Sequence, residues 1–335
     1  MKDILNRLFE YKSLSKEESK EVLVKLAQGE FNGSQMAAFL TVYLMRSITV
    51  DELEGFREAM LELCIPVEIE EYQAIDLCGT GGDGKDTFNI STLASFIVAG
   101  AGQNVAKHGN NGVSSVCGSS NLLSHFGYEF TNDIDRLRKS LDDAGICFLH
   151  APLFHPAMKN VAPIRKELGV KTFFNMLGPM ANPSFPKRQL VGVFSLELAR
   201  LYGYLYQKTD CSFSILHSLD GYDEVSLTGP FKAISHDGEK LISPSDLGLD
   251  TLTGDQLSGG ATVEESAEIF LRVLKGDGTR AQNEVVIANA GMAISCGKNL
   301  SPMEGVAQAR ESLESGKALK TFNSLINPIT KVSLN

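Results

Sequence analysis

The sequence predicts an α/β protein in two parts: a small, all-helical N-terminal domain and a larger α/β domain with a mostly parallel central sheet. Two observations carry this prediction. Helical patterns alone fill residues 1–66, and from residue 74 short apolar runs alternate with helical ones. Such alternation is typical of parallel sheets whose strands are joined by helices. A chain of 335 residues is long enough for two domains, and we place them at residues 1–66 and 70–330.

The first 66 residues carry clear signals for the starts of helices. Ser15 with Glu18, and Thr49 with Glu52, each have the spacing of a capping box. A helix between them, near residues 34–45, is apolar on nearly every side. Such a helix has to be covered all round, by its own fold or by a second subunit. We therefore expect a homodimer that forms through this domain.

The larger domain is predicted element by element. Apolar runs bounded by turn residues indicate strands at 74–78, 104–107, 146–150, 189–194, 212–217 and 224–227. Helical patterns indicate helices near 91–102, 118–126, 133–144, 155–168, 195–208, 263–274, 279–296 and 303–316. Residues 161–186 are rich in Pro, Phe and Asn, and we expect part of this segment to pass back between the domains and complete the helical domain.

Residues 75–92 carry the most specific signal in the chain. An apolar strand runs into four glycines within six positions, and a helix then opens on Asn89-Ile90-Ser91-Thr92. Glycines let the backbone N–H groups converge on a ligand. The N-terminus of a helix adds unpaired N–H groups and the positive end of the helix dipole. The stretch therefore predicts a phosphate-binding loop.

Two common phosphate motifs fit this stretch only in part. Its glycines satisfy G-x-G-x-x-G, but the next strand ends in Lys107, where a dinucleotide-binding fold needs an acidic residue for the ribose. The spacing from Gly79 to Lys85 fits G-x-x-x-x-G-K, but Asp86 replaces the required Ser or Thr. We exclude both motifs. A glycine-rich turn without a ligand stays the alternative.

Further polar groups follow later strands. Lys107-His108-Gly109-Asn110 brings a cation, an imidazole and an amide to the carboxyl edge of the sheet, where open α/β folds bind ligands. The adjacent Asp223 and Glu224 suit Mg²⁺, which prefers oxygen ligands and bridges to phosphates. Arg165 suits a planar carboxylate, with which a guanidinium forms two parallel hydrogen bonds. Each group also has a non-functional alternative. Residues 107–110 could form a solvated loop, Asp223 and Glu224 could be exposed turn residues, and Arg165 could form a surface ion pair with a glutamate.

The bulk composition excludes several classes of protein. The formal net charge is −10, without a basic stripe in the sequence, so nucleic acid and anionic membranes are not expected partners. Six cysteines form no C-x-x-C pair and no zinc spacing, which is typical of a reducing compartment. The sequence shows neither a signal-peptide pattern nor an apolar run that could span a bilayer. We therefore expect a cytoplasmic protein.

Five motifs, in order and in register, resemble those of the anthranilate phosphoribosyltransferases. They are Gly79-Thr80-Gly81-Gly82-Asp83, Asn89-Ile90-Ser91-Thr92, Lys107-His108-Gly109-Asn110, Arg165 with Asn175-x-Leu177-Gly178-Pro179, and Asp223-Glu224. The resemblance extends over nearly the whole chain. It implies a fold like that of nucleoside phosphorylases and phosphoribosyltransferases, a homodimer, and Mg²⁺ with two ions per subunit. The implied reaction, a step of tryptophan biosynthesis, transfers the 5-phosphoribosyl group from 5-phosphoribosyl-1-diphosphate (PRPP) to the amino group of anthranilate, giving N-(5-phosphoribosyl)anthranilate and diphosphate.

The resemblance also implies roles for single residues. Lys107, Asn110 and Arg165 would position the reactants, with no residue assigned as a certain catalyst. Gly79, Asn110 and Arg165 would contact anthranilate. Magnesium would be held by Ser91, Asp223 and Glu224. PRPP would be held by Gly79, Gly82, Asp83, Thr87, Asn89, Ile90, Ser91, Thr92, Lys107, Ser115 and Ser119.

The sequence departs from the family pattern at Ser120-Asn121, where Ala-Asp is usual. Asn121 keeps the shape of an aspartate and loses its charge. Two other functions stay open as alternatives. A pyrimidine nucleoside phosphorylase would share both domains but is not expected to carry an Asp-Glu metal pair. A non-catalytic relative that binds nucleic acid should have a basic groove and eroded metal ligands.

Overall fold

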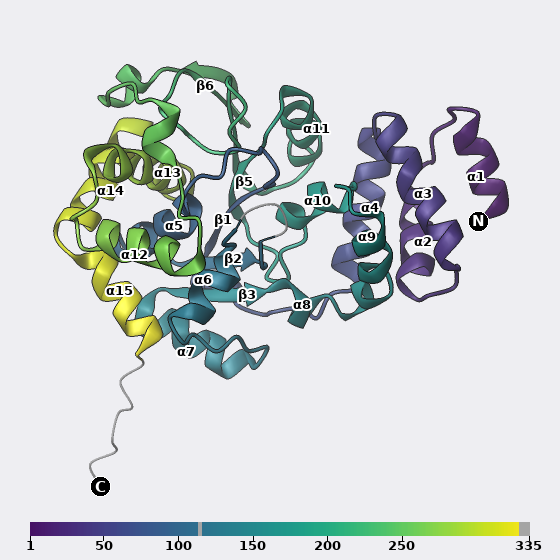
Figure 1. Cartoon of the computed structure of the whole chain (residues 1–335), viewed down its shortest axis with the longest axis horizontal. Helices are drawn as coiled ribbons and strands as arrows, with labels where there is room; N and C mark the ends of the chain where they lie inside the picture. The colour runs from purple at the N-terminus through teal and green to yellow at the C-terminus, as the bar shows by residue number, and fades with distance from the viewer. Residues whose placement is uncertain (113–115, 328–335) are drawn as a thin grey trace, which may run out of the picture.

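The structure is a computed structural model that describes residues 1–112 and 116–327. A bundle of N-terminal helices lies beside a larger α/β unit (Figure 1). The expected capping boxes at the starts of the second and fourth helices are both formed. None of the helices in the described residues is long and apolar enough to cross a membrane. The helices of the bundle are α1 (Lys2–Phe9), α2 (Lys16–Ala27), α3 (Gly33–Met45) and α4 (Val50–Glu62).

The α/β unit is built on one sheet of seven strands, in the order β3-β2-β1-β4-β5-β6-β7. The first five strands of the sequence pair in parallel, and the last two pair antiparallel at one edge. The expected mostly parallel sheet is thus confirmed. Its strands are β1 (Ile75–Gly79), β2 (Val105–Gly109), β3 (Ile146–His150), β4 (Arg188–Gly192), β5 (Ser212–Ser218), β6 (Phe231–Ser235) and β7 (Gly238–Ile242).

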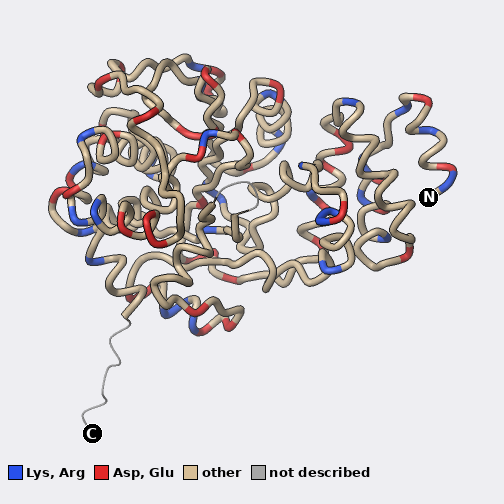
Figure 2. The backbone as a smooth tube through the Cα atoms, in the orientation of Figure 1, with Lys and Arg blue, Asp and Glu red and all other residues tan. Residues whose placement is uncertain are grey.

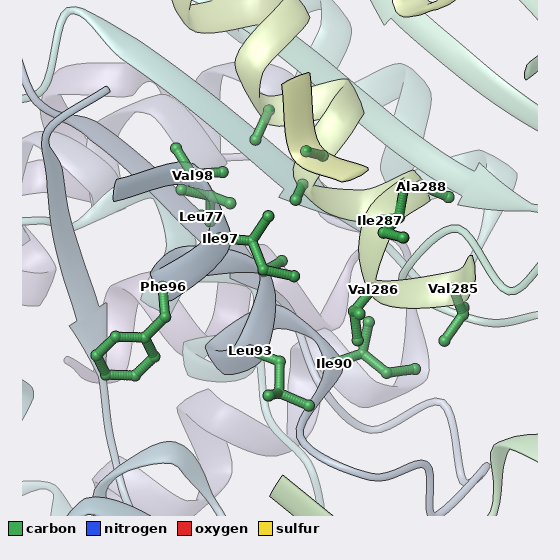
Figure 3. Close-up of a cluster of buried hydrophobic side chains, with 14 of the residues drawn as sticks. Leu77, Ile90, Leu93, Phe96, Ile97, Val98, Val285, Val286, Ile287 and Ala288 are labelled. Atoms are coloured by element: carbon green, nitrogen blue, oxygen red, sulfur yellow. The ribbon is translucent and has the colours of Figure 1, made fainter. Parts of the chain in front are cut away.

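Two apolar helices form the core beside this sheet. α5 (Ile90–Gly100) packs against α13 (Arg280–Lys298), and Figure 3 shows Leu93 and Ile97 of α5 near Val286 of α13. Because α5 is buried along almost its whole length, its N-terminus is held rigidly at the carboxyl end of β1. The other α-helices of the unit are α6 (Ser119–His125), α7 (Ile134–Ala144), α8 (Ala151–Phe154), α11 (Leu196–Tyr206), α12 (Val263–Leu274), α14 (Pro302–Glu314) and α15 (Lys317–Ile326).

Two predicted elements are wrong. Residues 224–227 form no strand, although Val225 and Leu227 are fully buried. The N–H of Val225 donates to the side chain of Asn289, so side chains take the place of a partner strand. The helix predicted at 155–168 is split into a 3-10 turn (Pro156–Asn160) and α9 (Ala162–Leu168). Pro163 explains the break, because a residue without an N–H fits only the first turn of a helix.

The sequence prediction also omits the β6–β7 hairpin and α15. The segment from residue 161 to 186 contains α9 and α10 (Phe174–Leu177) and runs against the helical bundle (Figure 1). Phe173 stacks on Phe56 of α4 with ring centroids 4.5 Å apart. It also packs edge to face with Tyr43 of α3, with ring centroids 5.2 Å apart. This aromatic cluster ties the segment to the interior of the bundle. Basic and acidic residues are interspersed over both units (Figure 2).

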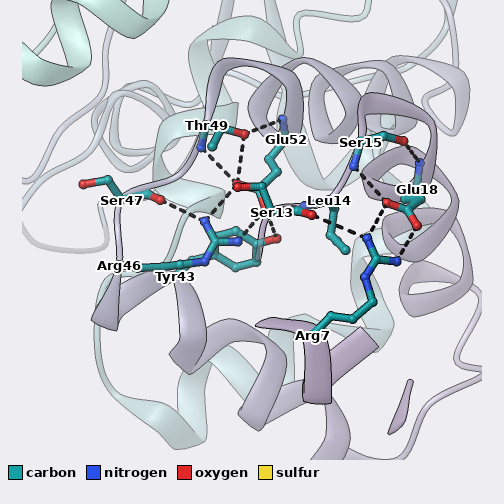
Figure 4. Close-up of polar contacts among 10 residues, drawn as sticks. All are labelled: Arg7, Ser13, Leu14, Ser15, Glu18, Tyr43, Arg46, Ser47, Thr49 and Glu52. Carbon is teal, nitrogen blue, oxygen red and sulfur yellow. Dashed lines mark hydrogen bonds and ion pairs between the residues drawn. The ribbon is translucent and has the colours of Figure 1, made fainter. Parts of the chain in front are cut away.

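The bundle has a buried polar centre at Glu52 (Figure 4). Its carboxylate is 0% exposed and accepts hydrogen bonds from the guanidinium of Arg46 and from the backbone N–H groups of Leu14 and Thr49. The hydroxyl of Tyr43 donates to the same carboxylate at 3.2 Å. A single buried charge therefore joins α3, α4 and the loop before α2.

We expect Glu52→Ala to destabilise the bundle, because removing one partner leaves Arg46 partly buried and uncompensated. Breaking such a buried pair costs about 3 kcal/mol or more. Thermal unfolding followed by circular dichroism would measure the loss. Glu21→Ala, which removes an exposed partner of Lys25 on α2, is the matched control and should leave the midpoint unchanged. Equal midpoints for the two variants would contradict this account of the bundle.

Candidate active site

A cavity of about 560 Å³ opens at the carboxyl ends of β1, β2 and β4 and reaches the helical bundle. Met60 of α4 and Arg165 of α9 line it on the bundle side. Among the predicted site residues, only Ser115 lies outside the described part of the chain. All the others line this one cavity, namely Gly79, Gly82, Asp83, Thr87, Asn89, Ile90, Ser91, Thr92, Lys107, Asn110, Ser119, Arg165, Asp223 and Glu224.

The glycine loop after β1 lies against the turn that carries Asp223. The N–H of Gly81 donates to Asp223 Oδ2 at 2.6 Å. A Cβ atom added to Gly79 would lie only 2.4 Å from the same oxygen. Any side chain at residue 79 would therefore push Asp223 out of the cavity wall. This contact explains why a glycine is needed at the end of β1.

The start of α5 forms the inner wall of the cavity. Asn89 occupies the N-cap position, and its side-chain amide donates to the carbonyl of Cys117 at 2.8 Å. Ser91 and Thr92 lie in the first turn, where helix N–H groups lack intrahelical partners. The hydroxyl of Thr87 donates a hydrogen bond to Glu224 Oε1 at 2.8 Å. The first turn of α5 thus presents an anion-binding surface beside a pair of carboxylates.

Three carboxylates gather on this wall: Asp83, Asp223 and Glu224. Burial away from water raises the pKa of both Asp223 and Glu224. The negative charge of Asp83 raises the pKa of Asp223 further, and the charge of Asp223 does the same for Glu224. The Oδ2 atom of Asp83 is buried without a hydrogen-bond partner. Repelling carboxylates and an orphaned oxygen fit a divalent cation. In the described residues, no three His, Cys, Asp or Glu side chains already form a metal-ligand group.

Two buried ionisable side chains, Lys107 of β2 and Asp76 of β1, lie on adjacent strands that end at the cavity. The Lys107 ammonium, 2% exposed, donates to the carbonyl of Leu77 at 2.5 Å and to the hydroxyl of Ser91 at 3.4 Å. Asp76 is fully buried on β1 and accepts from the N–H of His108 at 3.2 Å. Burial lowers the pKa of Lys107 and raises that of Asp76 to about 6. Asp76 is not among the residues predicted for the site, although an acidic residue inside an apolar strand is an available signal.

Arg165 faces the cavity from the bundle side. Its guanidinium lies 5.2 Å from the centre of the Phe174 ring and donates to Asn175 Oδ1 at 3.3 Å. Burial lowers the pKa of its guanidinium. Among the described residues, no carboxylate forms an ion pair with Arg165. The structure therefore does not support the alternative that Arg165 belongs to a surface ion pair. Asn110 lies exposed at the end of β2 on the opposite wall.

Two buried histidines also line the cavity: His108, whose imidazole the sequence places at the carboxyl edge of the sheet, and His155, which has no role assigned from the sequence. The rings of His108 and His155 lie 5.3 Å apart. Nδ1 of His108 forms a hydrogen bond with the carbonyl of Gly178 at 3.2 Å, and Nε2 of His155 forms one with the carbonyl of Ala181 at 2.9 Å. Burial lowers the pKa of His108 to about 3 and that of His155 to about 4. Both imidazoles are therefore neutral near pH 7.

The unusual Asn121 is accommodated without strain. Its side-chain oxygen accepts hydrogen bonds from the N–H groups of Gly112 at 2.8 Å and Gly118 at 3.2 Å. An aspartate would accept the same two bonds, so the neutral amide links Gly112 and Gly118 as the usual carboxylate would. The neighbouring Ser120 bonds His150 Nδ1 at 2.9 Å.

Known proteins share both units of this chain. Family models match the helical bundle domain of a glycosyl transferase family over residues 2–64 and the a/b domain of the same family over residues 71–319. Anthranilate phosphoribosyltransferase from Christiangramia forsetii is 62% identical over 97% of this chain and 98% of its own length. The Flavobacterium johnsoniae protein of the same name is 63% identical, with the same coverage.

Solved structures agree with these relatives. Anthranilate phosphoribosyltransferase from Thermus thermophilus superposes with a TM-score of 0.90, at 34% identity, over 96% of this chain and 98% of that one. The Saccharomyces cerevisiae enzyme in complex with PRPP and Mg has a TM-score of 0.88, at 26% identity, over 96% and 95% of the two chains. The chain therefore belongs to the anthranilate phosphoribosyltransferases of this glycosyl transferase family.

Proposed function

We propose that the protein transfers the 5-phosphoribosyl group of PRPP to the amino group of anthranilate, releasing diphosphate. The observation that carries this proposal is the shared cavity, which sets an anion-binding loop and a carboxylate pair on one wall and a half-buried arginine on the other. The first wall suits a diphosphate with its metal, and the second suits an aromatic carboxylate. Family membership supports the same reaction.

The donor fits the sheet side of the cavity. The loop containing Gly79, Gly82 and Asp83, together with Thr87, Asn89, Ile90, Ser91, Thr92, Lys107 and Ser119, would hold PRPP, as would Ser115. Ser91, Asp223 and Glu224 would hold Mg²⁺, two ions per subunit. When bound, Mg²⁺ would supply charge stabilisation for the leaving diphosphate. The raised pKa values of the carboxylate pair support this assignment, because a cation relieves their mutual repulsion.

The acceptor fits the bundle side. Arg165 would bind the carboxylate of anthranilate, and Gly79 and Asn110 would contact the ring and its amine. The aniline nitrogen is neutral near pH 7 and attacks the anomeric carbon through an oxocarbenium-like transition state. His108 and His155 stay neutral, so neither adds a charge that would repel the developing cation. Positioning by Lys107, Asn110 and Arg165 then supplies most of the rate enhancement.

We further propose that the protein is a cytoplasmic homodimer formed through its helical domain. This domain consists of residues 1–66 and is completed by part of segment 161–186, and the α/β domain consists of residues 70–330. The aromatic stacking of Phe173 on Phe56 supports assigning the segment to the helical domain. Large apolar side chains exposed at the ends of α1 and α3 or just beyond α1 support the dimer, because such groups favour burial against a partner. They are Phe9, Tyr11, Leu44 and Met45.

Arg165→Ala should raise the KM for anthranilate by about tenfold or more, because charge-assisted hydrogen bonds contribute about 1.5–3 kcal/mol. The KM for PRPP should change less than about twofold, since the donor binds on the other wall. Steady-state kinetics with each substrate varied in turn would measure both. Arg165→Lys keeps the charge without the bidentate geometry and should be intermediate. A parallel rise of both KM values would contradict the role assigned to Arg165.

Replacing both Asp223 by Asn and Glu224 by Gln should abolish Mg²⁺ binding in the presence of PRPP, because neutral amides are much weaker ligands for a hard cation. Isothermal titration calorimetry reads this without turnover. The matched control, Asp237→Asn with Glu239→Gln, removes two carboxylates from the β6–β7 hairpin, outside the cavity. Because the pKa of each carboxylate is raised, protonation should also weaken Mg²⁺ binding as the pH falls. Unchanged titrations for the cavity variant would exclude this metal site.

Met45→Glu should shift the protein from dimer to monomer at micromolar concentration, because a charge would be buried in the proposed interface. Multi-angle light scattering gives the mass directly. Met303→Glu on α14 changes another exposed methionine, in the α/β unit, and serves as the control. A wild-type protein that is itself monomeric would rule out the dimer.

A further inference from the structure

One cation outside the cavity holds the glycine loop. Lys171 lies between α9 and α10, and its ammonium donates to the carbonyl of Gly82 at 2.5 Å. Its aliphatic chain follows the loop closely: a Cβ atom at Gly82 would lie 2.9 Å from Nζ and 3.0 Å from Cε of Lys171. In the described residues, the cavity wall includes Gly82 but not Lys171. Lys171 therefore reaches the donor side only through the backbone of the loop.

The loop needs such a support. Gly81, Gly82 and Gly84 all have positive φ, of 66°, 80° and 72° respectively. Glycines in this region have many accessible backbone conformations, so the loop has a large entropy to lose when it closes on a ligand. A hydrogen bond to the middle of these three residues restricts the loop in the free protein. Pre-organisation of this kind lowers the entropic cost of binding.

The bond also fixes the direction of a donor group. In a trans peptide, the carbonyl of one residue and the N–H of the next point to opposite sides. Holding the Gly82 carbonyl toward Lys171 therefore turns the N–H of Asp83 to the side away from Lys171. This N–H belongs to the residues proposed to hold PRPP. Lys171 thus determines how the loop presents one of its anion-binding groups.

Lys171 is also connected to the acceptor side. The N–H of Thr172, the next residue, donates to Asn175 Oδ1 at 3.1 Å. The guanidinium of Arg165 donates to the same oxygen at 3.3 Å. One short segment therefore holds both the arginine of the acceptor wall and the lysine that supports the donor loop.

We propose that Lys171 is a positioning residue that anchors the donor-binding loop, through the Gly82 carbonyl, to the segment that carries the acceptor's arginine. This inference rests on the proposed function and adds a residue that acts without touching either substrate. Its predicted signature is a defect in PRPP binding that originates in the shape of the loop.

The test compares Lys171→Met with Lys187→Met, which removes an exposed lysine just before β4, at the opposite edge of the sheet. Lys171→Met should raise the KM for PRPP by about fivefold to tenfold, as expected for losing a hydrogen bond of about 1 kcal/mol or more. The KM for anthranilate should change less than about twofold. Lys171→Arg, which can still donate to the carbonyl, should restore most of the loss, and Lys187→Met should match the wild type.

A second measurement does not depend on turnover. Amide hydrogen exchange of residues 79–87 in the free protein should be faster in Lys171→Met than in the wild type and in Lys187→Met. Unchanged exchange and an unchanged KM for PRPP, in a wild type that is active, would overturn the role of Lys171. A wild type without transferase activity would instead overturn the proposed function, and the exchange experiment would still report whether Lys171 holds the loop. A loss that Lys171→Arg does not restore would also contradict the proposal.

Discussion

The site depends on one close approach between two pieces of backbone. The turn at Asp223-Glu224 lies directly on the ends of β1 and β4, where a Cβ atom at Gly192 would fall 1.5 Å from the carbonyl oxygen of Asp223. Glycine at 79 and 192 is therefore what lets two carboxylates lie against the glycine loop and the start of α5. Without this contact, the anion-binding loop and the acidic pair would lie on separate surfaces. Close packing at the carboxyl edge of the sheet thus sets the proposed phosphate-binding loop beside the proposed metal ligands.

The second wall of the site depends on the helical bundle. Arg165 belongs to a segment whose aromatic neighbour Phe173 is stacked inside the bundle, so the bundle's packing sets the position of the acceptor's arginine. The buried carboxylate of Glu52 holds the helices that form this interior. The stability of the bundle and the proposed recognition of anthranilate by Arg165 are therefore linked through the same aromatic cluster. The donor wall, by contrast, depends on the core between α5 and α13.

Much of this arrangement follows from the sequence, for physical reasons that can be named. The two-part fold, the parallel sheet and the residues around the cavity were predictable because glycine spacing, capping boxes and strand ends are local signals. The prediction of a strand at 224–227 was wrong, because its apolar residues are buried by tertiary contacts. The N–H of Val225 donates to the side chain of Asn289, 64 residues away, and not to a neighbouring strand. The role of Lys171 was out of reach, because it acts through a backbone carbonyl 89 residues away, which no local pattern records. Asp76 did have a local signal, as an acidic residue inside an apolar strand, but its partner, the N–H of His108, lies 32 residues away.

The central claim is that this one cavity joins anthranilate to a phosphoribosyl group with the help of Mg²⁺. The most direct measurement is the fluorescence of anthranilate on mixing the protein with anthranilate, PRPP and Mg²⁺, with EDTA as the control. The account predicts that fluorescence is lost only when all three are present and that EDTA prevents the loss. Unchanged fluorescence with a folded protein, or a loss that persists without PRPP, would contradict it.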